Sequence, residues 1–85
     1  DRPKYDQASK LFKAFGGARR LRDALECVGI YKQYSTVYRW GYAASRGGTD
    51  GVIPYKLLGA IGKAGENSSI RIPASLLKPA GLDDV

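Results

Sequence analysis

Hydrophobic residues recur at helical spacing near the start of the chain. Between residues 7 and 15 the apolar positions follow the spacing i, i+3, i+4, i+7, which places them on one face of a helix. They are Ala8, Leu11, Phe12 and Phe15. Asp6 is a candidate N-cap, and Gly16 is placed to end the helix. The pattern predicts a first helix over residues 7–15.

A second helix is predicted over residues 18–28, after the break at Gly16 and Gly17. Its apolar positions line one face, and its charged positions occupy the others. The apolar residues are Ala18, Leu21, Leu25 and Val28, and the charged residues are Arg19, Arg20, Arg22, Asp23 and Glu26. Gly29 is placed to end this helix.

Residues 30–40 allow two interpretations. They are rich in β-branched and aromatic residues, which favours a strand on propensity alone. Val37 and Trp40, however, are three residues apart among polar neighbours, as in a short helix over about 33–42 that packs through two residues. We expect the helix, with Ser35 as an alternative N-cap that would start it later.

Residues 41–53, at the start of the second half of the chain, contain four glycines, which predict a loop with turns. Pro54 fits the first position of a fourth helix, and Gly65 is expected to end it. Gly59 and Gly62 each cost that helix about 1 kcal/mol relative to alanine, so packing or the close approach of a neighbour must compensate. Its apolar residues at helical spacing are Leu57, Leu58, Ile61 and Ala64. Residues 70–72 are expected to be extended, and residues 73–78 to form a last helical turn.

Length and composition bound the fold and its surroundings. A chain of 85 residues, 44% of them hydrophobic, supports one small core. That excludes a doubly wound sheet or a (β/α)8 barrel and, with the predicted elements, indicates an all-α domain. The apolar runs are far shorter than the roughly 20 residues that cross a bilayer, so we expect a soluble chain with no membrane partner. The absence of methionine, even at position 1, suggests processing or a fragment of a longer protein.

The chain has few residues of the types that bind metals or carry out catalysis. The chain has no histidine and a single cysteine, Cys27, so neither a metal site nor an internal disulfide is expected. Ser45 and Ser75 have no base beside them in the sequence, and the acids form no paired-carboxylate motif. We therefore predict no cofactor and no enzymatic activity. The lone cysteine is consistent with a reducing, cytoplasmic compartment.

Charge supplies the first positive indication. Fourteen Lys and Arg residues against eight Asp and Glu give a net charge of +6. Between Lys10 and Arg46 there are eight bases and two acids. This density favours a polyanionic partner such as nucleic acid, the alternative being a solvated basic surface.

The second and third predicted helices match the helix-turn-helix plan, in which the second of the two enters the DNA major groove. A turn of about four residues would join them, and Val37 and Trp40 would pack the third helix on Leu21 and Leu25. The residues left facing outward are hydrogen-bonding types that pair with base edges, and they are the predicted base contacts. They are Gln33, Tyr34, Ser35, Thr36, Tyr38 and Arg39. A second interpretation makes Tyr31, Tyr34, Tyr38 and Tyr42 a stacking platform for single strands.

Two runs of the chain resemble the Cro/CI-type (lambda-repressor-like) helix-turn-helix regulators, and most closely the small Cro-like, YdaS-type subgroup. The residues that carry the resemblance are Phe15-Gly16-Gly17, Leu21, Ala24-Leu25, the run from Ser35 to Trp40, and the run from Arg46 to Pro54. The resemblance covers residues 8–65. It implies a compact fold of four to five helices and sequence-specific binding of double-stranded DNA by a bacterial or phage transcriptional regulator. By the same analogy we expect a homodimer, contact with further regions of the parent protein or the transcription machinery, and a nucleoid-associated location in the cytoplasm.

Departures from the family pattern occur at two places. The stretch from Glu26 to Tyr34 is longer than the usual link, and Asp50 places a carboxylate in the glycine-rich segment. We divide the chain into a DNA-binding domain over residues 1–66 and a tail, or the start of a further region, over residues 67–85.

Phosphate contacts are predicted from donors that flank the third helix. Glycines permit positive φ and close backbone approach, so their amides are included. The predicted phosphate contacts are Arg19, Arg20, Lys32, Tyr42, Arg46, Gly47, Gly48 and Lys56. The alternative function is a protein-interaction or assembly module, for example antitoxin-like, with non-specific nucleic-acid affinity and a contact surface on the fourth helix or on residues 70–77.

Overall fold

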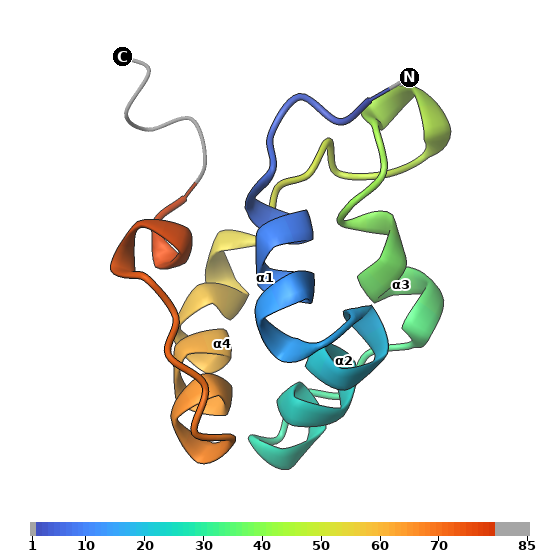
Figure 1. Ribbon diagram of the computed structural model, residues 1–85. Helices are drawn as coiled ribbons and strands as arrows, with labels where there is room; N and C mark the ends of the chain where they lie inside the picture. Colours follow the sequence, from blue (N-terminus) through green and yellow to red (C-terminus); the bar gives the residue numbers. More distant parts are fainter. Residues whose placement is uncertain (1, 80–85) are drawn as a thin grey trace.

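The computed structural model describes residues 2–79, and over this range the fold is all-helical, with no strand (Figure 1). Four α-helices and two short 3₁₀ helices follow one another along the chain. Their bounds are α1 Gln7–Phe15, α2 Ala18–Cys27, α3 Tyr34–Arg39, η1 Ala44–Arg46, α4 Tyr55–Asn67 and η2 Ala74–Leu77. The all-α expectation is confirmed, and the strand interpretation of residues 30–40 is not.

Helix α2 lies at the centre of the fold, where it packs against α1, α3 and α4. The apolar faces predicted for the first two helices enter one cluster together with residues of α3 and α4. The buried members of this cluster are Ala8, Leu11, Phe15, Ala18, Leu21, Leu25, Val37, Trp40, Ile53, Leu58, Ile61 and Ala64. Burial of these side chains, at about 25 cal/mol per Å² of apolar surface, is the main favourable contribution to folding.

The helix ends follow the predictions in part. Gly16 ends α1 in the left-handed conformation at φ 89°, as expected. Asp6 occupies the N-cap position of α1, but its side chain makes no capping hydrogen bond and instead forms an ion pair with Lys10, at 3.0 Å. Helix α3 is shorter than predicted, and Gln33 rather than Ser35 occupies its N-cap position.

Helix α4 is longer than predicted, because Gly65 does not end it. The helix starts at Tyr55, with Pro54 at the N-cap position, and continues to Asn67. A Cβ atom on Gly65 would lie 2.5 Å from Cδ1 of Ile72, so this glycine serves the close approach of the extended segment 70–72. A Cβ atom on Gly62 would lie 3.2 Å from Cδ1 of Leu77, whereas a Cβ atom on Gly59 would have no neighbour within 4 Å.

The C-terminal segment of the described chain packs on the helices. Ile70, Ile72, Leu76 and Leu77 are partly buried against the core cluster. Gln7, only 5% exposed, donates from Nε2 to the carbonyl oxygens of Leu76 (3.0 Å) and Lys78 (2.7 Å). Its Oε1 accepts the N–H of Ile53 at 3.0 Å. One buried amide therefore joins α1, the segment before α4 and the segment after η2.

Candidate nucleic-acid interface

Helix α3 is attached to the core through two side chains. Val37 is fully buried and Trp40 is 3% exposed, both in the cluster that contains Leu21 and Leu25 of α2. This confirms the packing predicted from their spacing. Because both apolar side chains face the core, the remaining residues of this short helix are directed toward its surface.

The exposed residues of α3 include most of the predicted base contacts. Gln33, Ser35, Thr36, Tyr38 and Arg39 are exposed. Among residues 2–79, no ion pair or side-chain hydrogen bond engages the guanidinium of Arg39. Four of these side chains project from α3, whose opposite side is buried, and that of Gln33 projects from its N-cap position.

Tyr34 differs from the other predicted base contacts because its hydroxyl is already used within the protein. It donates to Oδ1 of Asp23 at 3.0 Å, and the guanidinium groups of Arg19 and Arg22 lie over its ring at 5.2 and 4.7 Å from the centroid. These four residues, which we call the Asp23 cluster, join the first turns of α2 to the start of α3. In this arrangement the Tyr34 hydroxyl and ring link α3 to α2, while Arg19 of α2 remains exposed.

The connection between α2 and α3 is longer than the four residues expected, since six residues separate Cys27 from Tyr34. Its second residue, Gly29, has the left-handed conformation at φ 89°. Arg22 also holds this connection, because its Nε donates to the carbonyl oxygen of Lys32 at 2.9 Å. Ile30 packs against the core, so the longer connection is also attached to the helices by apolar contact.

Charge strengthens the Asp23 cluster. The hydrogen bond from Arg22 is the main cause that holds the pKa of Asp23 below its usual value, and the Tyr34 hydroxyl adds to it. The hydrogen bond to Asp23 in turn raises the pKa of Arg22. Because the folded-state pKa of Asp23 is lowered, its stabilising contribution is present above the unfolded-state pKa of about 3.9 and is lost as the pH falls through the lower folded-state pKa.

We expect Asp23→Ala to loosen the start of α3 at neutral pH. Amide hydrogen exchange of residues 34–37 should become faster at pH 7, because the variant lacks the acceptor shared by Arg22 and Tyr34. The difference from the unaltered protein should shrink as the pH falls through the lowered folded-state pKa of Asp23, because its carboxyl is then neutral in both states. Tyr34→Phe is the matched control, since it keeps the ring beneath the two guanidinium groups and removes one hydrogen bond. A difference that is independent of pH would contradict a charge-dependent role for Asp23.

The amides of Gly47 and Gly48, predicted to contact phosphate, are engaged within the loop itself. The N–H of Gly47 donates to the carbonyl oxygen of Ala44 at 3.1 Å, and that of Gly48 donates to Ala43 at 3.1 Å. The amides of Thr49 and Asp50 are also used, by the carbonyl oxygens of Arg39 and Tyr42. Gly47 does have positive φ, whereas Gly48 is required because a Cβ would lie 2.3 Å from the Tyr42 carbonyl oxygen. The loop therefore packs on the end of α3 and offers no free amides at these positions.

The other predicted phosphate contacts are exposed but belong to different parts of the surface. Arg20, Lys32, Tyr42, Arg46 and Lys56 are all exposed. Arg46 ends η1, which follows α3 closely in the chain. Lys56 lies in the first turn of α4, and Figure 1 shows α4 on the other side of α1 from α3. The structure therefore separates Lys56 from the residues near α3.

Asp50 has a role that the sequence did not indicate. It adopts a left-handed backbone conformation at φ 61°, and its Oδ1 accepts the N–H groups of Lys4 (2.8 Å) and Ala44 (3.4 Å). Its carbonyl oxygen accepts the N–H of Tyr5 at 2.9 Å. The carboxylate that departs from the family pattern thus joins the N-terminal segment to η1. An aspartate among glycines, a residue type that tolerates positive φ, was the signal that could have found it.

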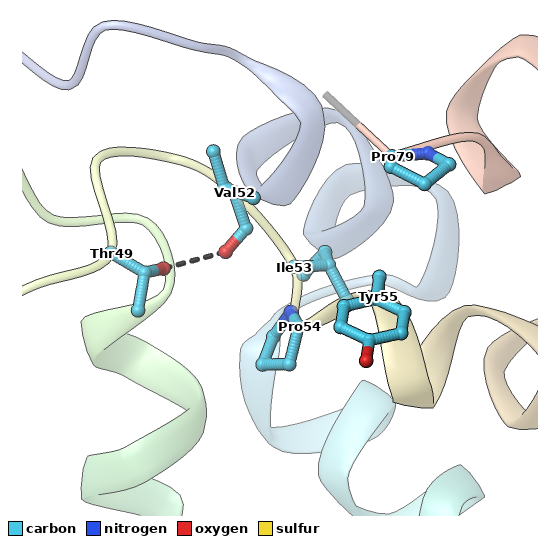
Figure 2. Close-up of a pocket in the computed structure, with 6 residues that line it drawn as sticks. All are labelled: Thr49, Val52, Ile53, Pro54, Tyr55 and Pro79. Carbon is cyan, nitrogen blue, oxygen red and sulfur yellow. Dashed lines mark hydrogen bonds between the residues drawn. The ribbon is translucent and has the colours of Figure 1, made fainter. Parts of the chain in front are cut away.

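An open hollow lies next to the start of α4 (Figure 2). Its volume is about 490 Å³, and its lining is mostly apolar. The hydroxyl of Thr49 points to the carbonyl oxygen of Val52, at 2.5 Å. The lining residues are Thr49, Val52, Ile53, Pro54, Tyr55 and Pro79. Tyr55 is the one titratable side chain among them, so this lining offers shape and apolar contact rather than acid–base chemistry.

Comparisons with protein-family models, with curated proteins and with solved structures find no match to this chain. Within residues 2–79, no helix has the length and apolar character needed to cross a bilayer. In the same part of the chain, no group of three or more His, Cys, Asp or Glu residues is arranged to hold a metal ion. The function must therefore be argued from α3 and its surroundings.

Proposed function

We propose that this chain binds double-stranded DNA in a sequence-specific manner, with α3 in the major groove, as part of a bacterial or phage transcriptional regulator. In this proposal α2 and α3 form a lambda-repressor-like helix-turn-helix. The observation that carries it is the orientation of α3, which is fixed to the core by Val37 and Trp40 and exposes Thr36, Tyr38 and Arg39. Base edges in the major groove are read by side chains of these polar types held on a rigid helix.

Charge supports the same function. Residues 2–79 contain all 14 bases and five of the eight acids, which gives 14 − 5 = +9 for the described part of the chain. Two of these acids, Asp23 and Glu26, are paired with Arg22, and a third, Asp6, with Lys10. A surface with this excess of cations attracts the phosphate backbone over the range of the Debye length, about 10 Å at 0.1 M salt.

Arg39 is the residue on which the proposed readout depends most. Its carbonyl oxygen accepts the N–H groups of Tyr42 and Thr49, both within 3.1 Å, so its backbone is fixed while its guanidinium is exposed. A guanidinium in this situation can pair in bidentate fashion with guanine O6 and N7.

We expect Arg39→Ala to lose about 1–3 kcal/mol of discrimination at one base pair, which is roughly a 5- to 150-fold loss of preference there. The measurement is selection of the chain on random duplex DNA, with sequencing of the enriched pool, followed by titration of the best site and of its single-base variants. Arg71→Ala is the matched control, because it removes the same charge from an exposed position outside α3. If Arg39→Ala keeps the full base preference, α3 does not read DNA through this residue.

The same selection on random duplex DNA tests whether the chain binds as a homodimer. A dimer would enrich palindromic sequences with half-sites about 34–36 Å apart, one turn of the double helix. A motif without palindromy would instead indicate binding as a monomer.

A protein-interaction module is the second candidate, and the hollow next to α4 favours it. Tyr55, 68% exposed, stands at the rim of this mostly apolar depression. The other surface considered for this function, residues 70–77, is less suitable because its apolar side chains are partly buried in the chain's own core. Salt dependence separates the two functions. DNA binding through Z phosphates gives a slope near −0.9Z in a plot of log K against log salt, whereas an apolar protein contact changes little.

A further inference from the structure

The N-terminal arm, residues 2–5, is attached to the loop that follows α3. The N–H of Lys4 donates to Oδ1 of Asp50 at 2.8 Å, and the N–H of Tyr5 donates to the Asp50 carbonyl oxygen at 2.9 Å. Gly51 packs directly against the arm, because a Cβ at this glycine would lie 1.8 Å from the carbonyl oxygen of Tyr5. The arm is therefore part of the folded surface rather than a free extension of α1.

Asp50 brings three segments together. The same Oδ1 atom that accepts from Lys4 also accepts from Ala44, the first residue of η1, and the Asp50 amide donates to Tyr42, just after α3. Figure 1 shows the arm, in dark blue, next to η1. The side chain and backbone of this one residue thus fix the arm and η1 relative to the end of α3.

The segments that Asp50 joins carry an excess of positive charge. Arg2 and Lys4 of the arm and Arg46 of η1 are exposed. Within residues 2–5 and 40–51, the only acid is Asp50 itself, whose side chain is turned to backbone N–H groups. Since the amides of Gly47 and Gly48 are used internally, phosphate affinity on this part of the surface must come from these cationic side chains.

We infer that Arg2 and Lys4, with Arg46, form a phosphate-binding site beside α3, and that Asp50 is the positioning residue that assembles it. The ligand is the phosphate backbone of double-stranded DNA, so the inference rests on the proposed function and extends it to a part of the chain outside the helices. The site adds affinity without reading bases, because lysine and arginine contacts to phosphate are independent of sequence.

The first test removes the two cations of the arm. For each phosphate that the variant no longer neutralises, Arg2→Ala/Lys4→Ala should bind the selected DNA site roughly eightfold more weakly at 0.1 M salt, with a salt slope smaller by about 0.9. The base preference should stay unchanged. Lys63→Ala/Arg71→Ala is the matched control, with the same decrease in charge at exposed positions. Lys63 lies in the second half of α4, a helix about 20 Å long that starts at Tyr55. Arg71 lies in segment 70–72, which packs beside the same half of the helix. Both control positions are therefore near the end of α4 that is opposite Tyr55.

A simple effect of net charge would lower affinity equally in both double variants, and that result would overturn the site. An unchanged affinity of the arm variant would overturn it as well. A larger decrease in affinity for the arm variant, accompanied by the smaller salt slope, supports it.

The second test separates the position of Asp50 from its charge. Asp50→Asn and Asp50→Gly remove the same negative charge, and both residues tolerate positive φ. Asparagine keeps an oxygen that can accept from Lys4 and Ala44, whereas glycine does not. We expect Asp50→Asn to bind DNA at least as tightly as the unaltered chain, and Asp50→Gly to bind several-fold more weakly, with faster amide exchange at Lys4 and Ala44.

Removing an acid near phosphate raises affinity if charge alone matters, so tighter binding by both variants would contradict the positioning role. Equal binding by the two variants would also contradict it. Both are compared at a temperature at which thermal unfolding shows them fully folded, so that a loss of stability is not read as a loss of binding.

The outcomes distinguish this inference from the proposed function. If Arg39→Ala loses base preference while the arm and Asp50 variants bind as the unaltered chain does, the function holds and the phosphate site does not. If the unaltered chain does not bind duplex DNA, both are wrong.

Discussion

Gly51→Ala is expected to lower the free energy of unfolding by about 3–5 kcal/mol, a large part of the stability of a domain of this size. Two effects add. Gly51 has φ 83°, where an L-residue is strained by about 1–2 kcal/mol. The added Cβ would also lie 1.8 Å from the Tyr5 carbonyl oxygen, so either the arm or the loop must move. Movement of the loop would also displace the Gly51 carbonyl oxygen, which accepts the N–H of Ala8.

Gly47→Ala is the control, because Gly47 has nearly the same φ, 81°, but nothing lies within 4 Å of the position of a Cβ. It should show only the cost of the backbone conformation, about 1–2 kcal/mol. Urea unfolding followed by circular dichroism measures both variants. Equal losses of stability would mean that backbone conformation alone determines the cost and that the packing of the arm on the loop contributes nothing.

Gln7→Glu is expected to be about as destabilising at neutral pH, by about 3–5 kcal/mol. The shape of the side chain is nearly unchanged, but the two N–H donors that point to the carbonyl oxygens of Leu76 and Lys78 are replaced by a carboxylate oxygen. A buried charge then faces two acceptors, and the N–H of Ile53 is the one donor that the side chain keeps. Burial and these acceptors would raise the folded-state pKa of the introduced carboxyl above its unfolded value of about 4.3.

Because that folded-state pKa is raised, the loss of stability should be smallest below about pH 4 and should grow as the pH rises toward the folded-state value. Thermal unfolding between pH 3 and pH 8 measures this dependence. The control is Gln33→Glu, the same chemical change at an exposed position, for which a change within about 0.5 kcal/mol is expected. A loss that is constant with pH would show that packing, not the buried charge, is responsible.

These two positions also show how the parts around α3 are connected. Gly51 fixes the arm against the loop, and Gln7 fixes the loop before α4 and the segment after η2 against α1. The segment 70–78 thereby contributes to the same core as the helices. Gln7→Glu is expected to affect DNA binding only through stability, whereas Gly51→Ala would also displace the arm from the loop. Arg39→Ala is expected to affect base preference in a folded protein.

The helices themselves could be predicted from local pattern. The apolar spacing in α1 and α2 and the positive-φ glycines that follow them determine those helices with few alternatives. Val37 and Trp40 were sufficient to place α3 and its buried side. The observed ends of the helix differ from the predicted ends by one to three residues. Sequence pattern succeeds here because each signal involves residues within a few positions of one another.

Glycine in the second half of the chain was harder to interpret. Gly65 looked like a helix end, yet it lies within α4, where Ile72 packs against it. Gly48 looked like a source of a free amide, yet it is required by the close approach of the carbonyl oxygens of Arg39 and Tyr42. The sequence does not distinguish a glycine that permits close approach from one that permits positive φ. The neighbour that would distinguish them is distant in the chain.

The candidate site shows the same division. The sequence indicated the exposed polar residues of α3 and the excess of positive charge, because both follow from local periodicity and composition. It did not indicate that Tyr34 is bound to Asp23 across 11 residues, nor that Asp50 accepts from Lys4 across 46. By itself, the sequence determined an all-helical chain with a basic surface and a short helix packed through Val37 and Trp40. The tertiary structure decided which donors are already used and which cations lie together, because hydrogen bonds between distant segments depend on the packing of the whole core.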